Sequence, residues 1–291
     1  MNAPPRLLFI TLSNIGDLVM TTPVLEALHE LFADCLIDIV ADARSASLLE
    51  ACPYRGDIFL KDKQAGWKAR WRFVLQLRRR KYRAIVDLRG PLLPFLLRGE
   101  ARMSKPPYRD ETMHAIEHHF SALRKIRPGT HVIPAPKIWI PQQAARTAHH
   151  ELAAFNAKHC LAIAPGANWP GKIWPADAYV SLIERVSNVF DGVCLFGGPD
   201  DRPTAEAITA AIELPAINLC GKTTLIAAAA CLAEMQHFVG NDSGLGHMAA
   251  ALGVPTLTVF GPGQPARYRP WGEHASLVYA PQNDLNQVFL F

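Results

Sequence analysis

The sequence predicts an α/β protein made of two halves, each built around its own parallel β-sheet. The chain has 291 residues, which is longer than one typical domain. An apolar run typical of a buried strand opens the chain at 6–11, and a second at 160–164 restarts the alternation of strands and helices. Four prolines between 128 and 141 indicate a linker region, and we divide the chain into domains of residues 1–150 and 151–291.

Hydrophobic periodicity predicts the order of elements in each half. The first half should contain strands over 6–11, 36–40 and 84–88, a helix over 18–31 with Pro23 in an early turn, and a basic helix within 61–83. The second half should contain strands over 160–164, 192–196, 216–219, 237–240 and 256–260, and helices over 142–158, 176–190, 203–212, 223–233 and after Asp242. Ligands of such sheets bind at the carboxyl ends of the strands, so two units in tandem predict a ligand cleft between them.

Composition excludes several classes of protein. Apolar residues make up 49% and charged residues 19%, which excludes disordered, collagen-like and small disulfide-bonded proteins. The six cysteines are scattered without a Cys-x-x-Cys pair, as expected in a reducing compartment. No run approaches the roughly 20 apolar residues of a membrane span, and no signal peptide follows Met1. We therefore expect a cytoplasmic protein.

Positive charge is concentrated in the first half. Residues 1–155 hold 23 Lys and Arg against 15 Asp and Glu, whereas residues 156–291 hold 7 against 11. The densest stretch, 61–83, has ten basic residues and one acid, and it includes Arg78, Arg79 and Arg80. Its helix should carry an apolar stripe of Trp71, Val74, Leu75 and Leu77. The charges either solvate an exposed helix face or attract an anionic partner, such as a membrane surface, a phosphorylated acceptor or a nucleic acid.

The turn at Gly166–Ile173 is close to a phosphate-binding P-loop but departs from it at two positions. Ile173 has no hydroxyl for Mg²⁺, and Pro170 removes a backbone donor, so an NTPase is disfavoured. Lys172 can still neutralise a phosphate as a point charge. The alternative is an exposed lysine near a helix start.

The segment from Phe238 to Pro255 predicts a second anion site. Asp242 or Ser243 is a good N-cap, Gly244 and Gly246 would let a ligand approach the first helical turn, and His247 lies one turn further on. Such a helix start can bind a diphosphate. The alternative is an ordinary N-cap with a packed histidine.

Asp17 follows the first strand and has two interpretations. It is either another N-cap or a carboxylate placed to deprotonate a hydroxyl at the carboxyl edge of the sheet. The sequence has no Gly-x-Gly-x-x-Gly, Asp-x-Asp or Gly-x-Ser-x-Gly motif and no cluster of cysteines of the kind that binds zinc. We therefore expect neither a bound metal nor a dinucleotide cofactor.

Three segments resemble bacterial ADP-heptose:lipopolysaccharide heptosyltransferases, glycosyltransferase family nine. They are ITLSNIGDLVMTTPVL at 10–25, the turn at 165–175, and GNDSGLGHMAAALGVP at 240–255 followed by Phe260-Gly-Pro. Weaker similarity extends through 82–90, 114–119, 196–199 and 221–225. The resemblance implies a GT-B fold and metal-independent transfer of a sugar with inversion at the anomeric carbon.

The resemblance also implies roles for particular residues. Asp17 corresponds to the general base and Lys172 to the lysine that binds the donor phosphate. Asp242, Ser243, Gly244 and His247 fall on the family's donor-binding segment. Beside the resemblance, we expect a donor contact from Asn168, acceptor contacts from Asn14 and Gly16, and, from the positive charge of the first half, acceptor contacts from Arg78, Arg79 and Arg80. The first domain would then bind the acceptor and the second the nucleotide-sugar donor.

The expected activity is transfer of a heptose from ADP-heptose to a lipopolysaccharide-core or related glycan, without a cofactor or nucleic-acid partner. The basic half should make peripheral contact with the anionic inner face of the inner membrane. Two departures leave alternatives open: 226–230 reads IAAAA where many members have a polar residue, and the chain ends with 284–291 where members continue into a terminal helix. A different nucleotide-sugar donor, or donor binding without transfer, are the alternatives.

Overall fold

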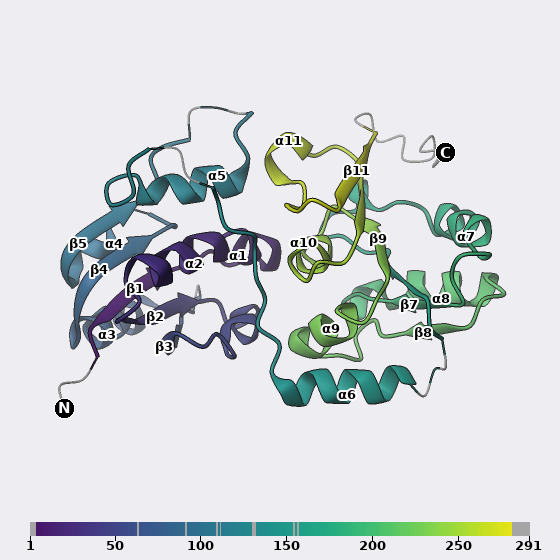
Figure 1. The fold of residues 1–291 in the computed structure, drawn as a ribbon, viewed down its shortest axis with the longest axis horizontal. Coiled ribbons are helices and arrows are strands. Elements are labelled where there is room, and N and C mark those ends of the chain that lie inside the picture. The colour runs from purple at the N-terminus through teal and green to yellow at the C-terminus, as the bar shows by residue number, and fades with distance from the viewer. Residues whose placement is uncertain are drawn as a thin grey trace. The chain divides into compact units, whose positions relative to one another are not determined.

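The computed structural model describes residues 4–62, 64–90, 92–108, 110, 112–129, 132–153, 155 and 157–280. The chain divides into two compact units, Met1–Trp139 and Ile140–Phe291. Each unit contains one sheet, and all neighbouring strands in both sheets run parallel (Figure 1). The predicted α/β class with two parallel sheets is confirmed. The expected terminal segment at 284–291 lies outside the described residues.

The first sheet has the strand order β3-β2-β1-β4-β5. Its strands are β1 (Arg6–Ile10), β2 (Leu36–Ala41), β3 (Arg55–Leu60), β4 (Lys81–Asp87) and β5 (Arg98–Ser104). The central strand β1 pairs with β2 on one side and β4 on the other, so the order of winding reverses between β1 and β4. The sequence did not predict β3 and β5, because these edge strands expose many of their residues and lack a continuous apolar run.

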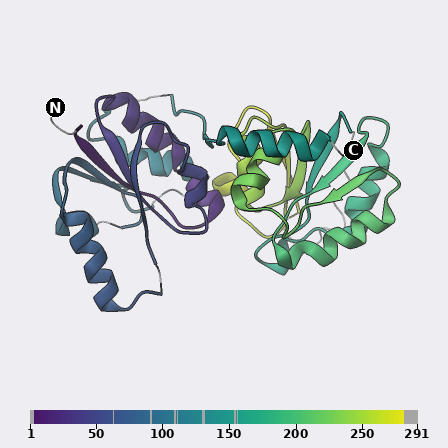
Figure 2. The same ribbon diagram turned by 90° about the horizontal axis from the view of Figure 1, so that it is seen from below.

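Helices cover both faces of this sheet. They are α1 (Ile15–Val19), α2 (Thr22–Leu31), α3 (Trp67–Arg78), α4 (Leu93–Leu96) and α5 (Ala115–Phe120), with 3₁₀ turns at Ala46–Leu49 and Ser121–Leu123. The contacting pair α2 and α5 lies on one face, and the contacting pair α3 and α4 lies on the other. Figure 2 shows the purple helix α2 above the sheet and the blue helix α3 below it.

The helix predicted over 18–31 is two helices, and the break has a local cause. Pro23 stands in the first turn of α2, where it lacks the N–H that a continuous helix would direct at the carbonyl of Val19. The Thr22 hydroxyl donates to that carbonyl at 2.8 Å, and the Thr21 hydroxyl donates to the Leu18 carbonyl at 2.7 Å. The two threonines thus satisfy carbonyls at the end of α1 and let α2 begin in a new direction.

The second unit contains a six-stranded sheet with the order β11-β10-β9-β6-β7-β8. Its strands are β6 (Cys160–Ala164), β7 (Gly192–Leu195), β8 (Ala216–Asn218), β9 (His237–Asn241), β10 (Thr256–Phe260) and β11 (Ala275–Tyr279). The winding reverses between β6 and β9, which pair directly. All five predicted strands are present, and β11 is an additional edge strand.

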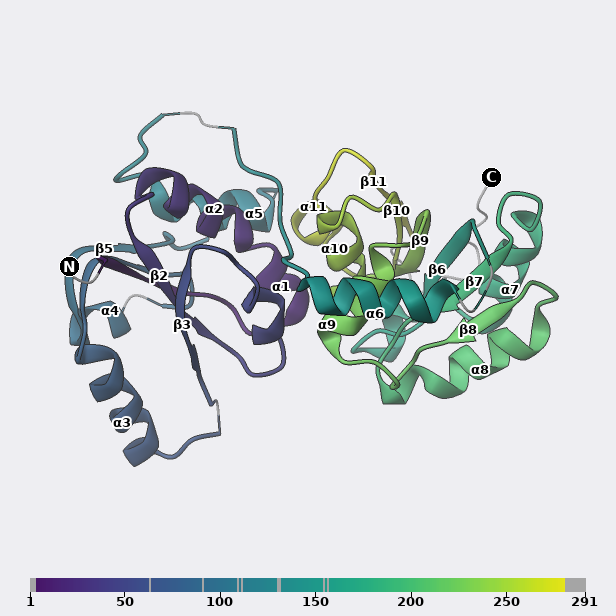
Figure 3. The same ribbon diagram turned by 60° about the horizontal axis from the view of Figure 1, so that its bottom comes forward.

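Its helices also form two layers. They are α6 (Gln142–Ala153), α7 (Ala176–Arg185), α8 (Arg202–Ala211), α9 (Leu225–Leu232), α10 (Gly244–Ala251) and α11 (Pro265–Tyr268), with 3₁₀ turns at Pro170–Lys172 and Pro199–Asp201. Helix α6 contacts α9, and the two lie side by side in Figure 3. The boundary drawn at residue 150 therefore falls inside α6, a helix of the second unit, which begins at Ile140. Among the described helices, none has both the length and the hydrophobicity needed to cross a membrane.

A buried carboxylate ties together the amino edge of the first sheet. Asp38 in β2 is fully buried and accepts hydrogen bonds from Arg6 and, at 2.6 Å, from Arg80. Arg80 also pairs with Asp57, and its guanidinium lies 5.1 Å from the centre of the Phe59 ring. The Arg80 guanidinium lowers the pKa of the Asp57 carboxyl. These contacts join residues from or beside β1, β2, β3 and β4.

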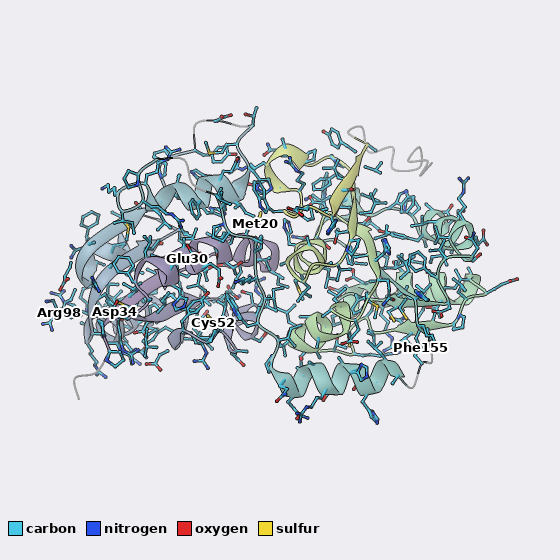
Figure 4. The ribbon with its side chains drawn as sticks, in the orientation of Figure 1. Met20, Glu30, Asp34, Cys52, Arg98 and Phe155 are labelled. Atoms are coloured by element: carbon cyan, nitrogen blue, oxygen red, sulfur yellow. The ribbon has the colours of Figure 1, made fainter. Side chains whose placement is uncertain are left out.

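Figure 4 shows how far this edge lies from the opposite one within the unit. Asp34 precedes β2 and Arg98 opens β5, and both are labelled at the end where the strands begin. Met20, at the end of α1, is labelled at the other end. The amino and carboxyl edges of the first sheet are therefore separate surfaces.

Asp38→Asn is expected to lower the free energy of unfolding by about 3 kcal/mol, because it leaves two arginines facing an uncharged amide in a buried site. Urea denaturation measures this loss. The control is Asp34→Asn, which removes the exposed partner of Arg83 and should change stability by less than about 1 kcal/mol. Equal losses in both variants would contradict the structural role given to Asp38.

Candidate active site

The loop that leaves β1 brings three predicted residues together on one turn. Asn14 occupies the N-cap position of α1, Gly16 is buried in its first turn, and Asp17 follows. The Asn14 side-chain amide donates a hydrogen bond to a carboxylate oxygen of Asp17 at 2.9 Å. The interpretation of Asp17 as an N-cap is therefore wrong. Asn14 instead orients the half-buried Asp17 carboxylate at the carboxyl edge of the sheet.

Arg89, for which no role was predicted from the sequence, holds this loop from the neighbouring strand. It follows β4, and its guanidinium donates to the Thr11 carbonyl at 2.7 Å and to the Ser13 hydroxyl. The Asp87 carboxylate accepts the backbone N–H groups of Arg89 at 2.8 Å and Gly90 at 3.2 Å. Burial raises the pKa of Asp87 and lowers the pKa of Arg89, so both charges sit in a partly desolvated layer.

A signal for Arg89 was present in the strand order. The loops after β1 and β4 meet where the winding reverses, and such points collect ligand-binding residues in open α/β sheets. Neighbouring strands cannot be assigned from a single sequence when the edge strands are missed. Arg89 was therefore recognisable only once the pairing of β1 with β4 was known.

In the second unit, Asn241 fixes the loop that carries Lys172. Asn241 ends β9 and is completely buried. Its carbonyl oxygen accepts the Trp174 N–H at 3.0 Å and the Tyr179 hydroxyl at 2.9 Å, and its amide donates to the Pro165 carbonyl at 2.7 Å. These bonds join the loop after β6 to the end of β9. The signal in the sequence for Asn241 was a polar residue directly after the buried residues Phe238, Val239 and Gly240, but no role was predicted for it.

Lys172 and Asp242 form an ion pair at this junction. Lys172 closes the 3₁₀ turn after β6, and its ammonium group contacts the carboxylate of Asp242, which follows β9. Both side chains are largely shielded from solvent. Two of the residues predicted to contact the donor, Lys172 and Asp242, are thus brought together. Lys172 is not an isolated surface lysine. Asn168 lies on the exposed part of the same loop, outside this pair.

The start of α10 lies directly beside this ion pair. Ser243 is the N-cap residue and Gly244 opens the helix, but the Ser243 side chain makes no capping bond. Its hydroxyl is buried and has no hydrogen-bond partner among the described residues. A helix start also has backbone N–H groups without partners in the helix and a positive dipole end. This end of α10 therefore offers unpaired donors beside a lysine.

Two other residues of the segment are packed inside the unit. A Cβ atom on Gly246 would lie 3.3 Å from the Thr258 hydroxyl and 3.5 Å from the Pro270 ring. Gly246 therefore allows α10 to lie close to β10, and the idea that it admits a ligand is wrong. His247 is buried one turn into the helix.

The three arginines assigned to the acceptor do not lie near Asp17. Arg78 and Arg79 are exposed at the end of α3, and Arg80 belongs to the Asp38 pairing network. All three immediately precede β4 and so lie at the amino edge, whereas Asp17 lies at the carboxyl edge. A strand of the length of β4 spans roughly 20 Å, so one sugar cannot touch both groups.

The chemistry of these groups is consistent with transfer from a phosphorylated donor. Lys172, the Ser243 hydroxyl and the start of α10 can bind an anion, and the Asp17 carboxylate can accept a proton. Within the described ranges, no group of three His, Cys, Asp or Glu side chains is arranged to hold a metal ion.

Comparison with known proteins identifies the family. Residues 98–288 match glycosyltransferase family 9 (heptosyltransferase). The chain is 28% identical to lipooligosaccharide heptosyltransferase 2 of Haemophilus influenzae, over 97% of this chain and 91% of that protein. It is 26% identical to lipopolysaccharide heptosyltransferase 3 of Escherichia coli, over 91% of this chain and 85% of that protein.

Solved structures show the same fold at lower identity. The ADP-heptose heptosyltransferase II of E. coli superposes with a TM-score of 0.80 at 22% identity, covering 97% of this chain and 96% of that chain. The E. coli heptosyltransferase WaaC with ADP gives a TM-score of 0.79 at 21% identity, with the same coverage. These likenesses confirm the predicted GT-B type of fold. Together with the match over 98–288, they show that this chain is a glycosyltransferase that belongs to family 9, the heptosyltransferases.

Proposed function

We propose that the protein transfers a heptose from ADP-heptose to a lipopolysaccharide-core or related glycan, inverting the anomeric carbon without a metal ion. The observation that carries this proposal is the pairing of Lys172 with Asp242 beside the Ser243 hydroxyl at the start of α10, for which the described residues offer no hydrogen-bond partner. Family membership and the names of the relatives support the choice of donor and acceptor class.

On the donor side, the leaving group is a nucleoside diphosphate whose negative charge grows as the sugar–phosphate bond breaks. The Lys172 ammonium and the backbone N–H groups of α10 would stabilise that charge. The Ser243 hydroxyl would donate to a phosphate oxygen. Asp242 would keep the lysine pointing toward the helix start before the donor arrives. These groups would replace the divalent metal that many sugar transferases use.

On the acceptor side, Asp17 would act as the general base. As the acceptor hydroxyl oxygen bonds to the anomeric carbon, its proton passes to the Asp17 carboxylate, and the electron pair of the breaking bond leaves with the diphosphate. Attack on the face opposite the leaving group inverts the anomeric centre. Asn14 would hold the carboxylate in position, and Gly16 would leave room for the acceptor next to it.

The assay that tests this function follows ADP release from ADP-heptose in the presence of a heptose-deficient lipopolysaccharide acceptor. We expect release to require the acceptor and to continue in EDTA, because lysine and helix N–H groups would neutralise the diphosphate. Abolition by EDTA with rescue by Mg²⁺ would contradict the metal-independent mechanism. Turnover with only another nucleotide sugar would change the donor, and binding without turnover would rule out transfer.

Asp17→Asn should lower kcat by about 10²–10⁴-fold, the usual contribution of a general base, with little change in the affinity for ADP. Steady-state kinetics and calorimetric ADP titration separate the two effects. Asp34→Asn removes an exposed carboxylate from the opposite edge of the same sheet and serves as the matched control. Near-normal turnover in Asp17→Asn would exclude this residue as the base.

Lys172→Met should weaken ADP binding by about 10–100-fold, because a charge-assisted hydrogen bond contributes about 1.5–3 kcal/mol. Calorimetric titration with ADP measures the loss. Lys158→Met is the matched control, since Lys158 is exposed just before β6, at the amino edge of the same sheet. If both variants bound ADP as the parent does, Lys172 would not be a phosphate ligand.

We also propose that the basic half makes peripheral contact with the anionic cytoplasmic face of the inner membrane. The acceptor role predicted for Arg78, Arg79 and Arg80 would then be indirect: they would bind the membrane that carries the acceptor, at a distance from Asp17. Arg80 is occupied by Asp38 and Asp57, so Arg78 and Arg79 are the members of the trio that remain exposed. Each basic residue near such a surface contributes about 1 kcal/mol.

A further inference from the structure

Helix α3 presents a stripe of large apolar side chains to solvent. Trp67, Trp71 and Leu75 recur every fourth residue, so they lie along one face of the helix. They are 75%, 50% and 46% exposed. The apolar stripe expected from Trp71, Val74, Leu75 and Leu77 is therefore divided between two faces, and Leu77 is the one buried member.

Helix α4 carries further exposed apolar side chains. It contacts α3, and Leu92, Phe95 and Leu96 are exposed on it and at its start. A hollow of about 470 Å³ between α3, the segment after β3 and α4 is lined in part by apolar side chains, including Phe73, Val74 and Leu93. We call Trp67, Trp71, Leu75, Leu92, Phe95 and Leu96 the α3–α4 patch.

The stability of the folded chain does not explain why the α3–α4 patch exposes so many large apolar side chains. Exposed tryptophans gain little from folding, and contiguous exposed apolar surface usually marks a binding site. The sequence of α3 contains four basic residues and no acidic one. Lys68 and Arg70 stand near its N-terminus, where the helix dipole disfavours positive charge. Both features become favourable against a partner that is anionic at its surface and apolar beneath it.

We propose that the α3–α4 patch inserts into the interfacial layer of an anionic lipid bilayer. This inference deepens the proposed membrane contact and rests on it. Binding would come from the aromatic side chains that insertion buries in the bilayer, as well as from charge. Tryptophan favours the boundary between headgroups and acyl chains, and flanking arginine and lysine favour the phosphate layer. With 12 residues, α3 is about 18 Å long and would lie in the plane of the interface.

The direction of α3 in the fold would place the membrane near the edge of the sheet that carries Asp17. The helix follows β3 and precedes β4, so it starts toward the carboxyl edge of the first sheet and ends at the amino edge. Figure 3 shows α3 on the outside of the unit, projecting away from the strands. Trp67 therefore lies toward the edge that carries Asp17. A patch seated in the bilayer would present a lipid-linked acceptor along that edge of the protein.

The test is binding to vesicles of phosphatidylglycerol and phosphatidylethanolamine, measured by co-sedimentation at low salt and in about 1 M salt, where charge–charge attraction is screened. Trp67→Ser with Trp71→Ser should weaken partitioning at least about tenfold at low salt and abolish the binding that survives at high salt. Val132→Ser with Val189→Ser removes two exposed apolar side chains elsewhere and is the matched control. Circular dichroism checks that each variant folds.

A charge variant separates insertion from simple attraction. Arg78→Glu with Arg79→Glu should weaken binding at low salt and leave the high-salt component in place. In the parent protein, brominated lipids should quench tryptophan emission, and the double serine variant should lose most of that quenching. Parent-like binding by the double serine variant, or no parent binding at high salt, would reduce the contact to electrostatics and overturn insertion.

Two further measurements keep this inference distinct from the transferase proposal. With an acceptor that lacks acyl chains, the double serine variant should turn over within about twofold of the parent, and a larger loss would place the patch in the active site instead. Sedimentation without lipid should show the same mass for both proteins. A parent dimer that the serine variant dissociates would make the patch a contact between copies. Vesicle binding can be read out even if no sugar transfer is observed.

Discussion

Parallel pairing of all described strands is the constraint on which the rest of the structure depends. A parallel pair requires a crossover that returns the chain to the starting edge, so every strand ends at one edge of its sheet. The apolar strands fill the interior, and polar side chains collect in the loops just beyond their ends. In both units the chemically distinctive residues follow the two strands where the winding reverses: β1 and β4 in the first, β6 and β9 in the second.

Ion pairs at the amino edge of the first sheet and at the carboxyl edge of the second have different roles. Asp38 is buried at the amino edge and is bound by two arginines, so its partners are fixed and its role is to join strands. Lys172 and Asp242 lie at the carboxyl edge of the other sheet, beside a helix start and the Ser243 hydroxyl, which has no hydrogen-bond partner within the part of the chain that the structure describes. A pair with unsatisfied donors next to it can exchange partners when an anion arrives. Loss of an arginine from the buried Asp38 would instead leave that carboxylate with an uncompensated charge and lower stability.

The basic residues of the first unit have different roles because they lie in different places in the structure. The sequence shows one dense basic stretch, and a single role for all of it is the simplest interpretation. In the structure, Arg80 belongs to the sheet framework, whereas Arg78 and Arg79 are exposed at the far edge from Asp17. The exposed tryptophans of α3 add an apolar component that the count of charges could not show. The proposed lipid interface combines this charge with hydrophobic surface and is separate from the chemistry proposed for Asp17.

The sequence by itself determined the α/β class, the central strands, the family and the segments that carry the candidate site, because these depend on local apolar runs and on short motifs. It could not determine β3 and β5, whose polar residues are tolerated only at the edges of a sheet. It also could not show that Pro23 and two threonine hydroxyls divide one helix into two. Tertiary structure alone decided that Arg89 supports the Asp17 loop, that Asn241 anchors the Lys172 loop, and that Gly246 serves helix packing. Each of these roles depends on contacts between residues far apart in the chain, and strand order rather than local sequence brings such residues together.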